Sequence, residues 1–131
     1  MTLTPFLMFT GQAEEAMRFY VATFADAEIL TLERHGPDGP GEEGAVKAAT
    51  FRIADQTFRC FDSPPVHAFG FTPAVSFFYD CEDEATLDAL FERLSAEGAV
   101  HMPPDRYPFA RRFAWVSDRF GVSWQLHLAF E

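Results

Sequence analysis

The four His of this chain are the side chains most able to hold a metal ion or to carry a proton between groups. They are His35, His67, His101 and His127. Most of them fall in segments that predict loops, and their spacing is not that of a metal site. We interpret His127, at the end of a predicted strand, as a surface residue rather than a catalytic one.

Two Cys and one basic pair are the other candidates for chemistry. Cys60 and Cys81 lie in apolar surroundings with no base fixed nearby by the sequence, and such Cys residues usually pack without reacting. Arg111 and Arg112 would attract an anionic ligand to the mouth of a cavity, or they simply offset an acidic surface. We favour the second interpretation of the pair and expect no nucleophile.

A polar face on an otherwise apolar strand is the main sign of a binding site. A hairpin is predicted near the C-terminus, with a tight turn at residues 118–121, where a Gly can supply the positive φ that such turns need. Side chains alternate along a strand, so Ser123, Gln125 and His127 share one face. A buried amide without a partner costs about 1–3 kcal/mol. Gln125 must therefore bond to backbone, water or a ligand.

The same alternation on the other predicted strands gives the candidates for a ligand pocket. They are Leu7, Phe9, Ser76, Phe78, Trp115, Ser123 and Gln125. Phe113 and His127 fall on the same predicted faces. Ordinary core packing is the alternative for the aromatic residues, because large apolar side chains are usually buried for their area alone. Phe69 and Phe71 are candidates for a lid, or for a seal where two parts of the protein meet.

Composition and charge limit the class of protein. The chain has 131 residues, 48% of them hydrophobic, which fits a single domain with one core. Its formal net charge of -10 argues against a nucleic acid or an anionic membrane as partner, because both need a basic surface. No apolar run approaches the roughly 18 residues of a membrane helix. Two Cys, with no basic-then-apolar leader, favour the cytoplasm.

The first half of the chain predicts one strand, one helix and three further strands. The predicted strands span residues 5–9, 28–33, 46–54 and 57–62, with a Gly- and Pro-rich loop at 35–44. The helix begins near residues 10–12, whose side chains can cap it. The spacing of its apolar residues sets one buried face, made of Ala13, Ala16, Met17, Tyr20 and Phe24.

The second half repeats this order. A strand is predicted at residues 74–79, followed by a helix that is capped near Asp83 and ends with Gly98 as its C-terminal cap. The apolar face of this helix consists of Leu87, Leu90, Phe91 and Leu94. A short strand at 99–102 and a Pro-rich loop at 102–108 precede the hairpin.

This repeat of pattern predicts an α+β fold made of two βαβββ modules. The modules span residues 3–62 and 74–131, joined by a loop at 63–73, within a single domain, 1–131. Each is too small to bury both faces of its sheet. We therefore expect the modules to pair as a cupped mixed sheet with the helices outside and a central space within.

Three segments resemble a known family. They are FLMFTGQAEEAMRFY at residues 6–20, PAVSFF at 73–78 and DRFGVSWQ at 118–125. They are similar to the PhnB-like (3-demethylubiquinone methyltransferase-like) branch of the vicinal-oxygen-chelate, or glyoxalase/bleomycin-resistance, superfamily. The resemblance extends from about residue 3 to residue 128. It implies the paired βαβββ fold, a ligand cavity and a homodimer, but no known reaction.

The resemblance also points to positions where the superfamily normally holds a divalent metal with His and Glu. In this chain they fall at Pro5, Ala74 and Gln125, with the fourth at Arg59 or Phe61. A metal site needs three or four His, Cys or carboxylate donors, and none of these residues is one. We therefore predict no metal and no cofactor.

The methyltransferase label does not fit the residues. A site for S-adenosylmethionine usually has a Gly-rich turn from a strand to a helix, whereas residues 36–44 carry Pro and acids and open no helix. We interpret this segment as a mobile hairpin loop.

The sequence thus predicts a homodimer with a largely apolar, metal-free pocket for a small molecule, and its reaction is unassigned. Three alternatives stay open. They are a non-catalytic binder of the bleomycin-resistance type, a divalent-metal-dependent glyoxalase- or dioxygenase-like enzyme, and a structural dimer whose pocket is filled by Phe. A cavity below about 300 Å³ would argue against any small-molecule function.

Overall fold

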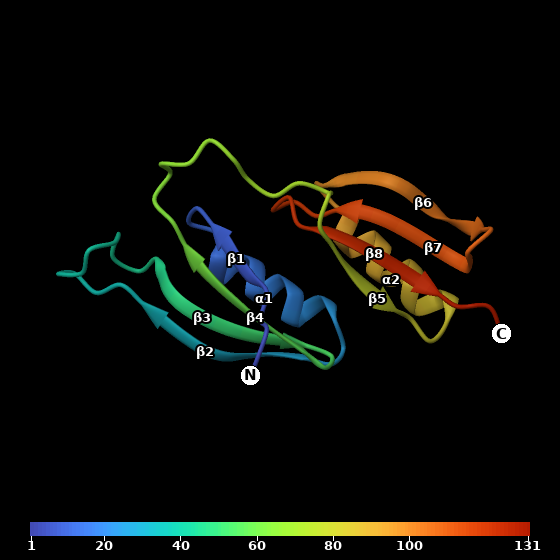
Figure 1. Ribbon diagram of the computed structural model, residues 1–131, viewed down its shortest axis with the longest axis horizontal. Coiled ribbons are helices and arrows are strands. Elements are labelled where there is room, and N and C mark those ends of the chain that lie inside the picture. Colours follow the sequence, from blue (N-terminus) through green and yellow to red (C-terminus); the bar gives the residue numbers. More distant parts are fainter. The chain divides into compact units, whose positions relative to one another are not determined.

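The computed structural model describes all residues, 1–131, and shows two compact units, Met1–Ala68 and Phe69–Glu131 (Figure 1). Each unit, called a module below, contains a strand, a helix and three more strands in that order. Both modules therefore have the predicted βαβββ pattern, and the fold class is α+β as expected. The boundary between them falls inside the predicted connecting loop.

The first module is a four-stranded mixed sheet with one helix packed on it. Its elements are β1 (Phe6–Phe9), α1 (Ala13–Thr23), β2 (Ala27–Arg34), β3 (Val46–Ile53) and β4 (Gln56–Asp62). The strand order is β1-β4-β3-β2, in which β1 runs parallel to β4 and the other neighbours are antiparallel. The Gly- and Pro-rich segment connects β2 to β3, as the predicted hairpin requires.

A row of aromatic rings lies between α1 and the sheet of the first module. Tyr20 of α1 stacks on Phe51 of β3, with ring centroids 5.9 Å apart. Phe51 in turn stacks on Phe58 of β4, at 5.0 Å. All three are buried, and the predicted apolar face of α1 is buried with them. This row is the centre of the core of the first module.

Asp62 holds the start of α1. Its Oδ1 accepts hydrogen bonds from the backbone N–H groups of Gly11 and Ala13, each at 2.9 Å, and its Oδ2 accepts one from Val46 at 2.9 Å. The expected cap from residues 10–12 is therefore wrong, since Gln12 occupies the N-cap position without a side-chain cap bond. The carboxylate that replaces it lies 49 residues from Ala13 in the sequence, so no local pattern signals it.

The second module repeats the first. Its elements are β5 (Ser76–Asp80), α2 (Glu84–Ser95), β6 (Ala99–Tyr107), β7 (Ala110–Ser117) and β8 (Ser123–Leu128). The strand order is β5-β8-β7-β6, with β5 parallel to β8 and the other pairs antiparallel. Of the predicted apolar face of α2, Leu87, Leu90 and Leu94 are buried, whereas Phe91 is only half-buried. Neither α1 nor α2 is long and apolar enough to cross a membrane.

Helix α2 begins as predicted and ends differently. Asp83 is its N-cap, and the carboxylate accepts a hydrogen bond from the backbone N–H of Thr86 at 2.7 Å. Gly98 is not the C-terminal cap, because the residue with left-handed backbone after the helix is Glu97, at φ 59°. Gly98 is required for another reason: a Cβ at this position would collide with the carbonyl oxygen of Ser117.

Strand β6 is longer than predicted. In place of a short strand and a loop, the structure has one nine-residue strand that contains Pro103 and Pro104. β6 lies at the edge of its sheet, and its pairing with β7 shifts register around Met102 and Asp105. Pro is tolerated on an edge strand and at bulges, because no neighbour needs the missing N–H.

The hairpin between β7 and β8 is confirmed, and Asp118 fixes its turn. The Oδ1 of Asp118 accepts hydrogen bonds from the backbone N–H groups of Phe120 and Val122, at 2.9 and 3.1 Å. Its Oδ2 accepts one from Nε1 of Trp124 at 2.9 Å. Gly121 has a φ of 92°, the backbone conformation for which the turn needs Gly.

Candidate functional site

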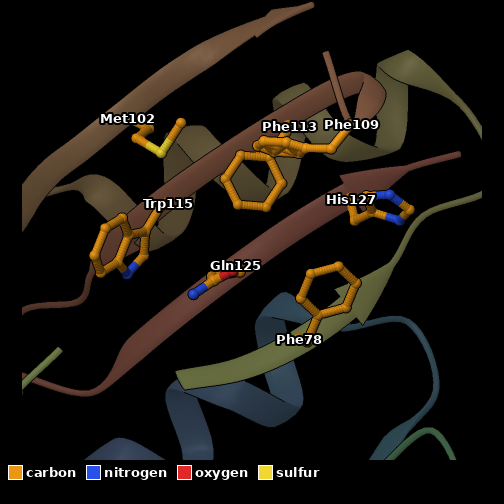
Figure 2. A pocket seen from close by; sticks show the side chains of 7 residues that line it. All are labelled: Phe78, Met102, Phe109, Phe113, Trp115, Gln125 and His127. Carbon is orange, nitrogen blue, oxygen red and sulfur yellow. The ribbon is translucent and has the colours of Figure 1, made fainter. Parts of the chain in front are cut away.

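A hollow of about 420 Å³ lies on the second sheet (Figure 2). Its lining consists of Phe78, Met102, Phe109, Phe113, Trp115, Gln125 and His127. These side chains come from all four strands of the sheet and from the turn between β6 and β7. The second module therefore builds the whole lining by itself.

The pocket occupies the face of the sheet opposite α2. On β7, Arg112 points toward α2, where its guanidinium donates a hydrogen bond to the carboxylate of Asp88 at 2.7 Å. Side chains alternate along the strand, so Phe113 and Trp115 point away from α2. Register pairing with β8 then places Gln125 beside Trp115.

Aromatic rings form most of the pocket wall. Phe113 is buried beneath the hollow, and Phe109 meets it edge to face with ring centroids 4.9 Å apart. The ring of Phe78 is a further neighbour of Phe113, with ring centroids 6.4 Å apart. Phe109 and Phe78 are 52% and 56% exposed, so they form the rim. Such walls suit a flat apolar molecule that can lie against the rings.

Trp115 is fixed in place by groups that do not line the pocket. Its Nε1 donates a hydrogen bond to Oγ of Ser123 at 2.8 Å, and Ser123 is bonded in turn to Ser76, Oγ to Oγ, at 2.6 Å. The indole also packs on the ring of His101, with centroids 4.9 Å apart. Because the indole N–H is already bonded, Trp115 offers only apolar surface to a ligand.

His127 is held by Asp80 at the opposite end of the pocket from Trp115 (Figure 2). Its Nδ1 lies 2.7 Å from Oδ1 of Asp80, and since a carboxylate only accepts, the ring donates this hydrogen bond. The ring packs 5.0 Å from that of Phe78, and the side chain is 19% exposed. His127 therefore forms part of the pocket wall, on the face of β8 that alternation predicted.

Gln125 is the polar group in the middle of the lining. Figure 2 shows its side chain between Trp115 at one end and Phe78 and His127 at the other. Its amide makes no hydrogen bond with another residue of the chain. An amide carries two donor hydrogens and an acceptor oxygen. All of this capacity is available to water or to a molecule in the pocket.

The structure brings some of the sequence-derived candidates together. Phe78, Trp115 and Gln125 line the pocket. Ser76 and Ser123 lie on the same strand faces but stand behind Trp115, where they bond to each other and to its indole. They therefore position an aromatic wall rather than form it.

Leu7 and Phe9 do not face a cavity, which corrects the expectation for them. Both are buried in the first module, and on β1 they stand in register with Cys60 and Asp62 of β4. The carboxylate of Asp62 bonds the start of α1, so this row of side chains faces the helix. Alternation predicted two faces of β1 correctly but does not say which of them the helix covers.

The proposed lid residues are also outside the lining. Phe69 is 68% exposed, and Phe71 lies beside Gly121 at the turn between β7 and β8. A lid made by these residues stays a prediction.

Alternation also placed Phe113 and His127 on the predicted cavity faces, and both line the pocket. Two lining residues, Met102 and Phe109, were missed. Met102 stands at the point where the short strand was expected to end, and Phe109 lies in a turn between two strands whose extents were predicted too short. Both could have been found only if β6 had been predicted at its full length, and its two prolines argue against such a prediction.

The positions at which the superfamily resemblance would put metal ligands are expected to hold no metal in this chain. Neither module brings together three His, Cys, Asp or Glu side chains that could hold an ion. Burial raises the pKa of Cys60 to about 12 and that of Cys81 to about 11. Both thiols are therefore protonated at neutral pH, which makes them poor nucleophiles and fits their interpretation as packing residues.

A second hollow, of about 410 Å³, lies in the first module beside the start of α1. Residues of the Gly- and Pro-rich loop line much of it, together with Asp62. Both carboxylate oxygens of Asp62 already accept backbone hydrogen bonds. The pocket of the second module, with an unbonded amide at its middle, is the better candidate for a ligand.

Comparison with known proteins identifies the family. The sequence model of the family described as 3-demethylubiquinone-9 3-methyltransferase matches residues 1–127. The chain belongs to this family. It is 48% identical to a solved structure from Bacillus cereus, described as a putative 3-demethylubiquinone-9 3-methyltransferase, PhnB protein, with a TM-score of 0.94 over 98% of this chain and 100% of that one. Protein YjdN of Escherichia coli is 25% identical over 98% of this chain and 95% of its own.

More distant structures share the fold. A glyoxylase/bleomycin resistance protein/dioxygenase domain from Frankia is 16% identical, with a TM-score of 0.67 over 100% of this chain and 93% of that one. The fosfomycin resistance protein FosX from Mesorhizobium loti is also 16% identical, with a TM-score of 0.64 over 98% of this chain and 92% of its own. The predicted resemblance to PhnB-like proteins is confirmed by the family model and the Bacillus cereus structure, and the likeness to the glyoxylase/bleomycin resistance and fosfomycin resistance structures is one of fold.

The family description names a methyl transfer, which would need a site for a methyl donor. The Gly-rich segment of this chain shows whether such a site is present. The segment connects two antiparallel strands, and at its base the N–H of His35 bonds the carbonyl of Ala45 at 2.9 Å. It is not a turn from a strand into a helix, the form in which Gly-rich loops hold dinucleotides or S-adenosylmethionine. The residues present do not fit such a site.

Proposed function

We propose that this member of the family binds a small, flat, largely apolar molecule in the aromatic pocket of its second module, without a metal ion. The observation that carries the proposal is the lining, in which four aromatic rings and Met102 surround only two polar side chains, Gln125 and His127. The volume of about 420 Å³ is within the range of small-molecule sites, roughly 300–1,000 Å³. A pocket filled by Phe side chains would leave no such space.

The donor chemistry supports a metal-independent site. Gln125 occupies the place where the superfamily resemblance puts an acidic ligand, and its neutral amide oxygen is a weak donor for a divalent ion. The pocket contains one imidazole, that of His127, and its Nδ1 is engaged by Asp80. One imidazole and one amide do not make the three or four ligands that a divalent metal needs.

Assembly and location form part of the same proposal. We propose that the two modules act as one domain, that the chain forms a homodimer, and that it works in the cytoplasm. Exposed apolar rings such as that of Phe6, 63% exposed, support a partner surface. The two cysteines are free rather than paired, which supports a reducing compartment.

Tryptophan fluorescence provides the test of binding. Trp115 lines the pocket, whereas Trp124 is buried on the other face of the sheet. Titration of the purified protein with naphthalene should give a saturable change in emission that a Trp115→Phe variant lacks. In that variant, a rise in melting temperature should still report binding. No saturable response in the wild-type protein would contradict the proposal.

The metal-free part of the proposal has its own measurement. Elemental analysis of the purified protein should find no stoichiometric zinc, nickel or manganese, and a chelator should leave naphthalene binding unchanged. Stoichiometric metal, or binding that disappears with the chelator, would contradict it.

A second candidate function is catalysis by His127. The observation that favours it is the hydrogen bond from Nδ1 to Asp80, which fixes the ring in one tautomer, as in general acid–base sites. Mass spectrometry of a bound compound after incubation would reveal turnover. Turnover that persists in a His127→Gln variant would remove this candidate.

A further inference from the structure

One side chain of the pocket keeps all of its hydrogen-bonding groups unused. We infer that the amide of Gln125 selects the ligand, and that the ligand is an uncharged planar heteroaromatic molecule with a hydrogen-bond donor and an acceptor side by side on one edge, as in a lactam ring. This inference rests on the proposed function, because it requires a flat molecule in the aromatic pocket.

The other polar side chains of the lining offer less than a donor and an acceptor together, since His127, with its Nδ1 donating to Asp80, keeps only the acceptor Nε2. The indole N–H of Trp115 donates to Ser123, and the Nδ1 of His127 is bonded to Asp80. Gln125 makes no hydrogen bond within the chain. It is therefore the lining residue that offers a donor and an acceptor together.

The charge of the lining favours a neutral molecule. No Lys, Arg, Asp or Glu lines the pocket. An anionic group would find no cation there, and the chain as a whole carries a net charge of -10. A cationic group would find no carboxylate in the lining. Desolvating a charge without a partner is costly, so neither kind of ion suits this pocket.

The shape of an amide determines which edge it can pair with. Its N–H and C=O lie in one plane, so it bonds two groups at once when a flat ligand presents an acceptor next to a donor, as Gln does with the edge of adenine. The ring of such a ligand would lie against the rings of Trp115 and Phe78, between which the amide stands (Figure 2). A ligand that lacks the donor would leave the Gln125 carbonyl unpaired in an apolar site, which lowers affinity.

Three ligands of nearly equal size separate edge recognition from apolar binding. Isoquinolone presents an N–H next to a carbonyl, isocoumarin replaces that N–H by a ring oxygen, and naphthalene has neither group. For the wild-type protein we expect isoquinolone to bind at least about tenfold more tightly than isocoumarin or naphthalene. A Gln125→Met variant should bind all three with similar affinity. The matched control is Gln56→Met, an exposed position of the first module, which should keep the wild-type preference.

A Gln125→Glu variant provides a readout that a purely structural role would not change. A carboxylate only accepts, so it pairs with an edge that carries two donors. We expect this variant to prefer an aminoisoquinoline whose amino group neighbours a protonated ring nitrogen, and to bind isoquinolone at least about tenfold more weakly than the wild-type protein does. Melting temperatures of both Gln125 variants establish that they are folded.

The outcomes distinguish this inference from the proposed function. If the wild-type protein binds naphthalene and isoquinolone equally, the pocket binds apolar molecules but Gln125 does not select them, and the inference is overturned. If Gln125→Glu keeps the wild-type order of affinities, it is overturned as well. If none of the three ligands binds, the proposed function fails and the inference fails with it.

Discussion

The two modules share one topology but present different side chains on the face of the sheet that their helix leaves open. In the first module, the parallel pair of β1 and β4 sets Phe6 opposite Arg59, whose guanidinium lies 5.9 Å from the centre of the Phe6 ring. In the second, the equivalent pair of β5 and β8 sets Phe78 opposite Gln125. One open face carries a guanidinium beside an exposed ring, while on the other a neutral amide lies among the aromatic rings of a pocket. The shared topology therefore does not fix which side chains stand on the open faces.

The buried anchors of the two modules differ as well. Each module has one buried Asp whose carboxylate accepts three hydrogen bonds, Asp62 in the first and Asp118 in the second. Asp62 joins the start of α1 to β3, whereas Asp118 fixes the β7–β8 turn and the indole of Trp124. The start of α2 depends instead on Asp83, which is exposed and bonds one N–H.

Removing the carboxylates that hold the two helix starts should give the largest difference between the modules. An Asp62→Ala substitution leaves three N–H groups without their acceptor, two of those bonds being buried, and should lower the free energy of unfolding by about 3 kcal/mol. The matched Asp83→Ala variant loses one exposed cap and should cost about 1 kcal/mol. Urea denaturation of both variants measures the comparison. Equal losses would mean that Asp62 is no more than an ordinary cap.

The close approach of Gly98 to β7 should give the next largest effect. A Cβ at Gly98 would collide with the backbone of Ser117, so Gly98→Ala should cost about 2 kcal/mol through displaced backbone. The control is Gly36→Ala in the first module, where an added Cβ meets nothing within 4 Å. Denaturation midpoints give the comparison. If Gly98→Ala were as mild as Gly36→Ala, the packing of Gly98 on β7 would be wrong.

Placing a charge on the open face of the second module should make it resemble the first. A Phe78→Arg substitution puts a guanidinium at the pocket rim. It should weaken naphthalene binding at least about tenfold, because an apolar ligand would displace water that solvates the charge. Stability should change little, since Phe78 is already exposed. Met8 stands at the corresponding step of β1, opposite Phe61, and Met8→Arg should leave naphthalene binding unchanged. Fluorescence titration of both variants measures this, and equal loss in both would contradict a pocket confined to the second module.

Local sequence patterns predicted the elements well where local spacing determines them. The alternation of β8 and the apolar faces of the two helices follow from periods of 2 and 3.6 residues, and the structure shows them, with Phe91 of α2 half-buried rather than buried. The turn at residues 118–121 follows from the backbone freedom of Gly121. These features depend on neighbours in the sequence, which is why a single sequence is sufficient for them.

The errors concern contacts between distant residues. Leu7 and Phe9 were placed on the wrong face because only the pairing of β1 with β4 decides which side α1 covers. The cap of α1 comes from Asp62, across the module, rather than from residues 10–12. Phe109 joins the pocket because β6 continues through two prolines as an edge strand. Strand order and edge position settle all three, and neither can be read from local periodicity.

The ionic contact between α1 and β2 should give the smallest effect and a characteristic pH dependence. Hydrogen bonds from Arg34, and then from Arg18, hold the pKa of the Glu14 carboxyl at about 2, below its ordinary value of 4.5. A carboxyl whose pKa is lowered by folding stabilises the folded state fully above its unfolded pKa, and the contribution is lost as the pH falls toward the folded value. Glu14→Gln should therefore cost less than about 1 kcal/mol at neutral pH, because the contact is largely solvated.

The difference between wild type and Glu14→Gln should shrink between about pH 4.5 and pH 2 and vanish below that window. Urea denaturation at a series of pH values measures it. The control is Glu92→Gln on α2, an exposed residue with no ion pair, for which the difference should stay near zero throughout. If the stability difference for Glu14→Gln stays constant down to pH 2, the substitution destabilises the protein through lost packing rather than through the lost negative charge. In that case the contact of α1 with β2 would not depend on the ionised carboxylate at all.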